Sequence, residues 1–265
     1  MIKRFLLAIA LVSGPLHAQD TPLVSLDTGE ANRGWEAVGR LDIAGKGFCT
    51  AALIRETMIL TAAHCLFDFD GTPVTAERIT FSAGLRGGRA DATRGVSRLA
   101  VHPDYAFDPT DRTDNVAVDI AVLELDQAIR LSRVQPFSIA PQPDAGERIG
   151  IVSYGRGREN APSLQDVCNV IGKQRGVVAM TCSVDFGSSG APVFRIVEGR
   201  AEIVSVVSAM AELEGAPVSL GTSLDGPLDA LMAHFAAFGP ARPGGSSRLL
   251  SVGQRNDTGA KFVRP

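Results

Sequence analysis

Three short segments of the sequence carry residue types that together perform nucleophilic catalysis. Segment 61–65 reads Thr-Ala-Ala-His-Cys, segment 119–123 opens with an aspartate and continues as an apolar run, and segment 187–192 reads Gly-Ser-Ser-Gly-Ala-Pro. A serine hydroxyl attacks well when a base takes its proton, and imidazole suits that task near neutral pH. A buried carboxylate fixes the imidazole tautomer and stabilises the imidazolium. The segments therefore predict acyl transfer that uses His64, Asp119 and a serine.

The serine segment predicts both a nucleophile and the donors that assist it. Gly187 and Gly190 flank Ser188 and Ser189. Acyl transfer needs N–H groups that converge on the tetrahedral oxyanion, and glycine permits the tight turn that presents them. Taken alone, this segment is also typical of a polar turn, and His64 is also compatible with a structural role. The occurrence of all three segments in one chain favours catalysis.

Other titratable residues compete for these roles. Asp114 and Asp126 are the alternatives to Asp119, but neither opens an apolar run. His102, in a Val-His-Pro-Asp-Tyr stretch, is expected in a surface loop rather than as a base. His234 falls on a predicted helix and is expected to be half-exposed or to cap the helix. Asp119 is therefore the favoured carboxylate.

Short apolar runs between turn residues must position these segments. The expected strands span 36–43, 48–54, 58–62, 79–83, 95–101, 120–125, 147–153, 167–171, 177–182, 191–196 and 203–210. Many short strands at this spacing predict an all-β sandwich or barrel. Apolar residues at helical spacing predict one helix over 227–238, with Gly-Pro after it.

Composition and the first residues bound the location of the protein. The chain has 265 residues, a formal net charge of −3 and 6% aromatic residues, which argues against nucleic acid or anionic membranes as partners. Residues 1–18 combine a basic end, a short apolar run and a small residue before Gln19, which predicts a signal peptide and no stable membrane insertion after cleavage. The protein is therefore expected to be secreted or periplasmic.

The four cysteines favour disulfides. Cys49, Cys65, Cys168 and Cys182 all follow the signal peptide and would meet an oxidising compartment. Zinc is the alternative, but the sequence has no Cys-x-x-Cys pair. We expect neither a metal nor an organic cofactor.

The three motifs resemble those of the trypsin/chymotrypsin-like serine peptidases, in particular the divergent bacterial secreted branch that includes glutamyl endopeptidase-like enzymes. The histidine motif matches residue for residue, the aspartate motif matches, and segment 187–192 is similar to the family's Gly-Asp-Ser-Gly-Gly-Pro. The register set by Gly190 and Pro192 makes Ser189 the nucleophile. The resemblance implies two six-stranded antiparallel β-barrels packed face to face, with a C-terminal helix and the active site between the barrels.

The residue patterns and the resemblance together divide the chain, and the resemblance assigns its site residues. The expected parts are a signal peptide (1–18), an arm or propeptide (19–34), a peptidase domain (35–240, with the barrel boundary near 130–145) and a flexible tail (241–265). The resemblance implies the disulfides Cys49–Cys65 and Cys168–Cys182. It implies a triad of His64, Asp119 and Ser189, with the amides of Gly187 and Ser189 holding the oxyanion.

Specificity is read less directly from the resemblance. The implied substrate-binding residues are Ser183 at the pocket base, Val184, Ser208, Ala209 and Met210. Val207 stands where the glutamate-selective enzymes have a histidine, so no strong preference for glutamate is expected. A small or medium apolar side chain, or a basic one that reaches Asp185, both fit this pattern.

One departure concerns activation. Ser188 stands where trypsin-like enzymes carry an aspartate that pairs with a newly cut N-terminus, and the arm has no clear activation junction. Activation by insertion of a new terminus is therefore not expected. The sequence predicts a secreted serine endopeptidase acting on polypeptides, with its oligomeric state open. A non-catalytic secreted binding module on the same fold is the main alternative, and an esterase is a minor one.

Overall fold

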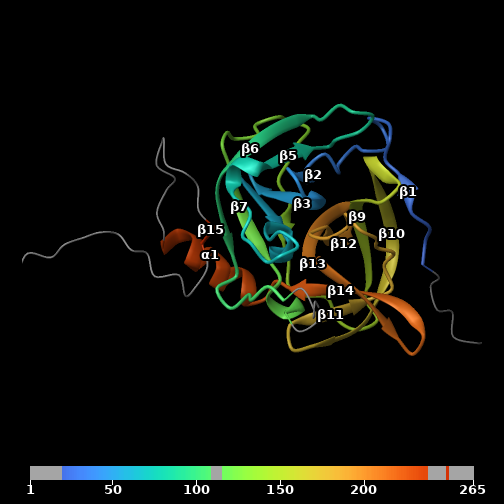
Figure 1. The fold of residues 1–265 in the computed structure, drawn as a ribbon. Helices are drawn as coiled ribbons and strands as arrows, with labels where there is room; N and C mark the ends of the chain where they lie inside the picture. The colour runs from blue at the N-terminus through green and yellow to red at the C-terminus, as the bar shows by residue number, and fades with distance from the viewer. Residues whose placement is uncertain (1–19, 109–114, 238–248, 251–265) are drawn as a thin grey trace, which may run out of the picture.

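The computed structural model describes residues 20–108 and 115–237 and the backbone of 249–250, and it consists mostly of β-strands (Figure 1). The predicted signal peptide, Gln19 and Asp114 lie outside these residues, as does the tail apart from its short strand β15 (Leu249–Leu250). No helix in the described part of the chain is long and apolar enough to cross a membrane.

The first half of the chain forms a closed six-stranded barrel. Its strands are β2 (Val38–Ile43), β3 (Gly47–Arg55), β4 (Met58–Thr61), β5 (Ile79–Ala83), β6 (Ala92–Val101) and β7 (Ala121–Leu125). The pairing order β5-β2-β3-β4-β7 is antiparallel and closes because β6 pairs with both β7 and β5. Fully buried Leu41, Leu53 and Phe81 fill the interior, so burial of apolar side chains stabilises this barrel.

The second half repeats this arrangement. Its strands are β9 (Arg148–Gly155), β10 (Arg158–Gln174), β11 (Val177–Met180), β12 (Pro192–Val197), β13 (Arg200–Leu213) and β14 (Ala216–Ser223). The order β10-β11-β14-β13-β12 closes because β9 pairs with both β12 and β10. Two short strands extend this sheet: β1 (Val24–Ser25) on β10 and β8 (Ser138–Ile139) on β13. The predicted all-β fold with two six-stranded barrels is confirmed.

One α-helix, the only one among the described residues, packs the end of the domain against the first barrel. Helix α1 (Pro227–Ala237) lies against β6 and β7 and buries Leu231 and Phe235 (Figure 1). The guanidinium of Arg98 on β6 sits over the Phe235 ring, 3.6 Å from its centroid. The predicted helix is confirmed up to Ala237, the last described residue there.

Two strands of the second barrel differ most from the sequence-based expectation. The predicted strand 167–171 lies within the 17-residue β10, and β14 was not predicted at all. Polar residues interrupt the apolar pattern of β10, while small and polar residues make up much of β14. In both strands, pairing with neighbouring strands overrides a weak local pattern.

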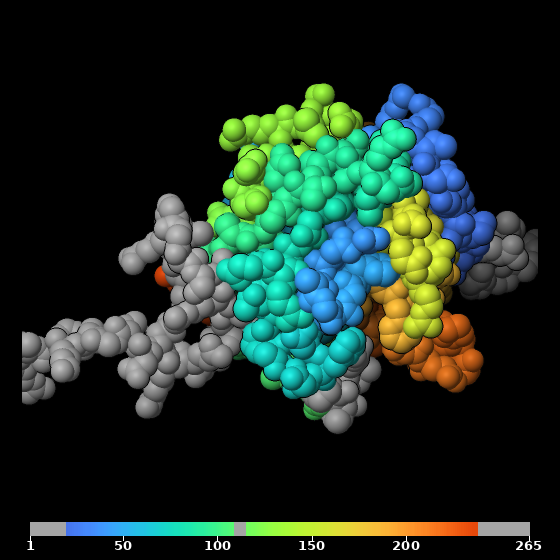
Figure 2. All heavy atoms as spheres, turned by 45° about the horizontal axis from the view of Figure 1, so that its top comes forward, coloured from blue at the N-terminus to red at the C-terminus, as the bar shows by residue number. Residues whose placement is uncertain are grey.

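The described part of the predicted arm contacts the second barrel. Thr21 Oγ1 donates a 2.6 Å hydrogen bond to Asp166, and β1 pairs with β10. Figure 2 shows this N-terminal segment, in dark blue, lying alongside the yellow part of the second half of the chain. The described arm thus covers an edge of the second barrel.

Candidate active site

His64 lies on a 3-10 helix, η1 (Ala63–Leu66), that is held from two sides. A disulfide joins Cys49 of β3 to Cys65, with an S–S distance of 2.03 Å. The Lys46 ammonium donates hydrogen bonds to three carbonyl oxygens, those of His64 (2.9 Å), Cys65 (3.0 Å) and Phe67 (2.5 Å). A short helix leaves its last carbonyls without internal partners, so Lys46 caps this end. The imidazole is therefore carried by a fixed backbone.

Asp119 orients that imidazole. The aspartate follows η3 (Val116–Val118), precedes β7 and is only 3% exposed. Its Oδ1 accepts a 2.8 Å hydrogen bond from the backbone N–H of His64, and its Oδ2 lies 2.7 Å from His64 Nδ1. With Nδ1–H directed at the carboxylate, Nε2 is the ring nitrogen that can accept a proton.

A third donor completes the environment of this carboxylate. The Ser208 hydroxyl donates to Asp119 Oδ2 at 2.5 Å. Burial raises the pKa of the Asp119 carboxyl, but the charge of His64 and the hydrogen bonds from His64 and Ser208 lower it more. The pKa therefore lies below its ordinary value, and Asp119 stays ionised at neutral pH.

Ser189 lies in the loop between β11 and β12, and both barrels hold this loop. Thr50 of β3 donates its backbone N–H to the Ser189 carbonyl at 2.8 Å, and Gly190 donates to the Val207 carbonyl at 2.8 Å. Gly190 has a φ of 78°, and a Cβ there would overlap Thr61 Oγ1 and the Thr50 carbonyl. Only glycine fits this position, so the tight packing of the loop fixes where Ser189 stands.

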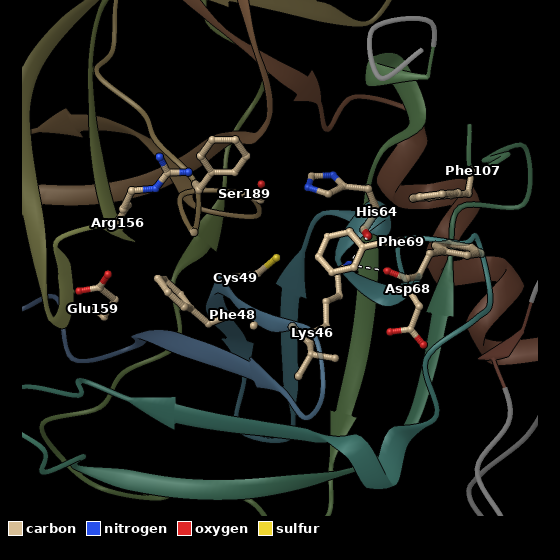
Figure 3. A pocket seen from close by; sticks show the side chains of 15 residues that line it. Lys46, Phe48, Cys49, His64, Asp68, Phe69, Phe107, Arg156, Glu159 and Ser189 are labelled. Carbon is tan, nitrogen blue, oxygen red and sulfur yellow. Dashed lines mark hydrogen bonds between the residues drawn. The ribbon is translucent and has the colours of Figure 1, made fainter. Parts of the chain in front are cut away.

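The Ser189 hydroxyl faces the His64 imidazole across the mouth of one cavity, which both residues line (Figure 3). Within the described residues, Ser189 Oγ has no hydrogen-bond partner. Catalytic hydrogen bonds are often long until substrate is bound, so this geometry is compatible with proton transfer from Ser189 to His64.

Two amides of the serine loop are available to an oxyanion. Across the residues that the structure describes, the N–H groups of Gly187 and Ser189 have no acceptor, whereas Ser188 N–H donates to the Asp185 carbonyl at 2.9 Å. Gly187 has a φ of 95°, and a Cβ there would overlap the ring of Phe48. These two amides are the pair that the sequence analysis assigned to the oxyanion.

Ser188 is fully buried beneath this loop, and its hydroxyl makes several hydrogen bonds. Its hydroxyl donates to the Tyr154 carbonyl at 3.1 Å and accepts from Arg158 Nη2 at 2.9 Å. The same guanidinium donates to the hydroxyl (3.0 Å) and the carbonyl of Ser153. A Cβ on Gly155 would come within 2.7 Å of Arg158 Nη2, so glycine makes room for this side chain. An internal cation thus supports the loop from below.

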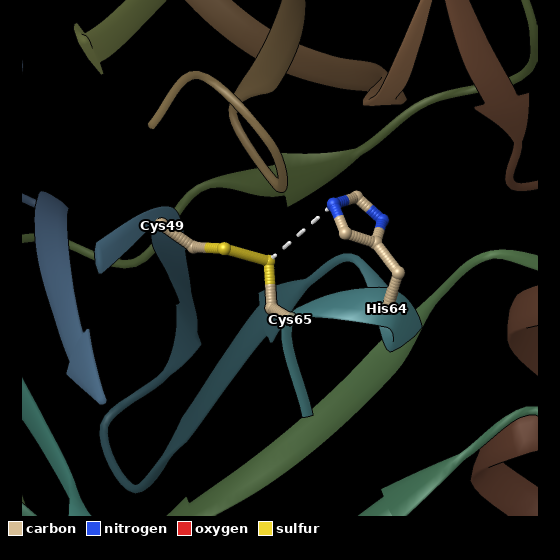
Figure 4. A group of neighbouring side chains, drawn as sticks. All are labelled: Cys49, His64 and Cys65. Carbon is tan, nitrogen blue, oxygen red and sulfur yellow. Dashed lines mark hydrogen bonds between the residues drawn. A yellow bond between two sulfur atoms is a disulfide. The ribbon is translucent and has the colours of Figure 1, made fainter. Parts of the chain in front are cut away.

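Both expected disulfides are present. Cys168 of β10 bonds to Cys182 with a Cα–Cα distance of 5.0 Å, and this link lies beside the serine loop. Figure 4 shows the Cys49–Cys65 bond next to His64, whose Nε2 lies 4.0 Å from Cys65 Sγ. Because sulfur atoms bonded to each other are not thiolate ligands, this group of Cys49, His64 and Cys65 does not support a zinc site.

A cavity of about 250 Å³ lies at the expected specificity pocket. Its lining residues are Val184, Asp185, Phe186, Ser189, Val207, Ser208, Ala209 and Met210, and the role of Val184, Ser208, Ala209 and Met210 in substrate binding stays a prediction. Ser183, expected at its base, is exposed and not among its lining residues. The Ser183 N–H donates to Gln165 Oε1 at 2.7 Å, which ties this stretch to β10.

The structure describes two further histidines, His102 and His234. His102 is only 4% exposed, so the expectation of a surface loop was wrong. Its N–H donates to the Ile120 carbonyl, and its Nδ1 accepts from the Asp104 N–H at 3.2 Å. Burial lowers its pKa, so it stays neutral. His234 is half-buried on α1, as expected, and Asp126 is exposed.

Comparison with known families identifies the class of this protein. Residues 27–217, more than half of the chain, match the family described as Trypsin. The chain belongs to the trypsin family.

Two animal proteases illustrate the relationship. Human "Serine protease 56" is 30% identical over 138 residues, which is 50% of this chain and 21% of the human protein. "Transmembrane protease serine 9" of Rattus norvegicus is 37% identical over 91 residues, 34% of this chain and 8% of the rat protein. The chain thus spans a small part of these relatives. They do not confirm the expected bacterial branch, which stays a prediction.

Proposed function

We propose that this protein is an exported serine endopeptidase in which Ser189 is the nucleophile, His64 the general base and Asp119 its orienting carboxylate. The 2.7 Å contact between His64 Nδ1 and Asp119 Oδ2, in a chain of the trypsin family, carries this proposal. Trypsin-family membership and serine-protease relatives support a serine peptidase of the hydrolase class.

The reaction proceeds in two acyl-transfer steps. Ser189 Oγ attacks the peptide carbonyl while His64 Nε2 takes its proton, and the amides of Gly187 and Ser189 hold the oxyanion. His64 then gives the proton to the departing amine, which leaves an acyl-enzyme on Ser189. Water, deprotonated by His64, attacks this ester and releases the acid. Asp119 stabilises the imidazolium in both steps.

The proposed location of the protein follows from its cysteines and its predicted signal peptide. Two disulfides and a trypsin-like domain suggest an extracellular protein. We propose that residues 1–18 direct export to the periplasm or the medium, and that residues 35–240 form the peptidase domain. The proposed boundary between the barrels, at 130–145, falls between β7 and β9. Within the trypsin family, we propose that this protein belongs to the bacterial secreted branch.

Cleavage of an unfolded protein tests this function. The mature protein is incubated with a reduced, alkylated protein, and the new peptides are identified by mass spectrometry. We expect peptides from the wild type and from Ser132→Ala, a control at an exposed serine, and none from Ser189→Ala. Cleavage that survives Ser189→Ala contradicts the proposal, and a folded wild type that cuts nothing supports the binding-module alternative.

A further inference from the structure

The cavity that Ser189 and His64 both line is a second cavity beside the one near Met210, and it lies on the side of the Cys49–Cys65 disulfide. Its volume is about 360 Å³, and Ser189, His64 and Cys49 all line it. Small-molecule sites begin at roughly 300 Å³, so this cavity has room for a large side chain. The cavity near Met210 lies beyond Ser189 and does not include His64. The two cavities therefore flank the nucleophile.

Aromatic side chains form much of the wall of this second cavity. Five of the nine phenylalanines that the structure describes line it, namely Phe48, Phe67, Phe69, Phe107 and Phe186. Figure 3 shows Phe48 on one side of the cavity and Phe69 and Phe107 on the other. Phe67 and Phe107 stack with centroids 5.2 Å apart. Such a wall offers ring faces and edges on several sides.

Two of these rings lie exposed at the rim. Phe69 is 69% exposed and Phe186 is 55% exposed, although both are fully apolar. Water contact with two phenyl rings is unfavourable, and an apolar ligand that covers them removes this cost. Exposed aromatic rings beside a cavity thus point to an apolar ligand.

The charged side chains in the wall already have partners. The Lys46 ammonium caps the carbonyls of η1, and Asp68 accepts two hydrogen bonds from Arg78, at 2.6 and 2.9 Å. The Arg156 guanidinium lies over the Phe186 ring, 4.2 Å from its centroid. Glu159 accepts a backbone N–H at 2.8 Å. The cavity therefore favours an apolar side chain over a charged one.

The chemistry decides which part of the substrate reaches this cavity. His64 Nε2 must give its proton to the leaving nitrogen, so the residue after the cleaved bond lies on the imidazole side of Ser189. The disulfide sulfur 4.0 Å from Nε2 belongs to the same side. We propose that this cavity binds an aromatic or large aliphatic side chain on the residue directly after the cleaved bond. This proposal rests on the proposed endopeptidase function.

Acyl transfer to added amines measures this selectivity directly. A panel of N-acetylated amino-acid thiobenzyl esters acylates Ser189 and releases the thiol. An amino-acid amide then attacks the acyl carbon with its amino nitrogen, His64 takes the amine proton, and Ser189 leaves and recovers a proton. Water competes for the same acyl-enzyme. The product ratio of aminolysis to hydrolysis is therefore independent of the amount of active protein.

We expect phenylalanine and leucine amides to be captured at least about tenfold better than glycine and aspartate amides, since apolar contacts of this size discriminate by such factors. Phe69→Ala should lower the phenylalanine-to-glycine ratio about threefold or more. Because Phe69 is largely exposed, this variant should fold. Val197→Ala, which truncates a 52% exposed apolar side chain outside the cavity, should keep the wild-type ratio.

Two negative results have different meanings. Normal ester hydrolysis with equal capture of all amides, or an unchanged ratio in Phe69→Ala, overturns the proposed selectivity and leaves the peptidase function standing. No turnover of any ester by folded wild-type protein overturns the proposed function and this inference with it.

Discussion

The partly buried Arg158 guanidinium offers a sharp test of how the serine loop is supported. Replacement by methionine, Arg158→Met, keeps much of the side-chain volume and removes the hydrogen bonds to Ser153 and Ser188. Within the described chain no carboxylate lies within 4.0 Å of this cation. Burial lowers its pKa, while the charges of Asp185 and Glu159 oppose that shift.

The magnitude follows from opposing contributions. Three hydrogen bonds from a charged donor contribute about 1.5–3 kcal/mol each. Burying the charged guanidinium costs several kcal/mol of desolvation, and its removal abolishes this cost, which opposes the loss of the hydrogen bonds. The net loss of stability is therefore about 1–3 kcal/mol. Ser188 keeps its bond to Tyr154, so the loop loosens rather than collapses. Because one misplaced oxyanion donor costs about 10²–10³ in rate, we expect fluorophosphonate labelling of Ser189 to slow about 10- to 100-fold.

Two assays separate these effects. Urea unfolding is followed by the fluorescence of Trp35, the only tryptophan, whose ring lies 5.0 Å from that of Phe194. Labelling rates are measured on folded protein. Arg130→Met is the matched control, since its exposed guanidinium pairs with Glu56 and lies outside both this hydrogen-bond network and the two cavities at Ser189. Wild-type labelling by Arg158→Met, with unfolding free energy within about 0.5 kcal/mol of the wild type, would refute the supporting role.

Three further predictions concern the triad and its loop. Ser208→Ala removes a hydrogen-bond donor from the ionised Asp119. Because a charge-assisted hydrogen bond contributes about 1.5–3 kcal/mol, we expect kcat/KM for an ester to fall roughly 10- to 100-fold. An unchanged kcat/KM would contradict this prediction. Gly190→Ala forces a Cβ into Thr61 and should cost at least about 3 kcal/mol in urea unfolding, so a near-neutral effect would show that the loop can move. Because the folded pKa of Asp119 is lowered, its contribution to stability is complete at neutral pH and is lost as pH falls below about 3.9 towards the folded pKa. The stability difference between wild type and Asp119→Asn should therefore shrink on acidification, and a constant difference would refute this linkage.

The site was predictable where its chemistry needs fixed residue types. Asp119 was selected because it opens an apolar strand, and the structure brings it to His64. Gly190 was predictable for the same reason, since the turn tolerates no Cβ. Local sequence carries these signals because each depends on a few neighbouring residues.

Residues that act through distant contacts were not predictable. Lys46 and Arg158 look like ordinary surface cations in the sequence, and only the folded chain brings them to η1 and Ser188. His102 was misplaced for a similar reason, because its burial depends on packing around Ile120. Ser183, predicted at the pocket base, does not line the cavity beside Ser189, because loop geometry, rather than local pattern, decides which side chains line a cavity.

Site-resolved labelling by a fluorophosphonate tests the central claim most directly. Folded mature protein is treated with the probe, and the modified residue is identified by mass spectrometry of its peptides. An assembled triad predicts one adduct, on Ser189, that disappears in Ser189→Ala and slows strongly in His64→Ala. No adduct on folded protein, or an adduct that persists in Ser189→Ala, would contradict the proposed active site.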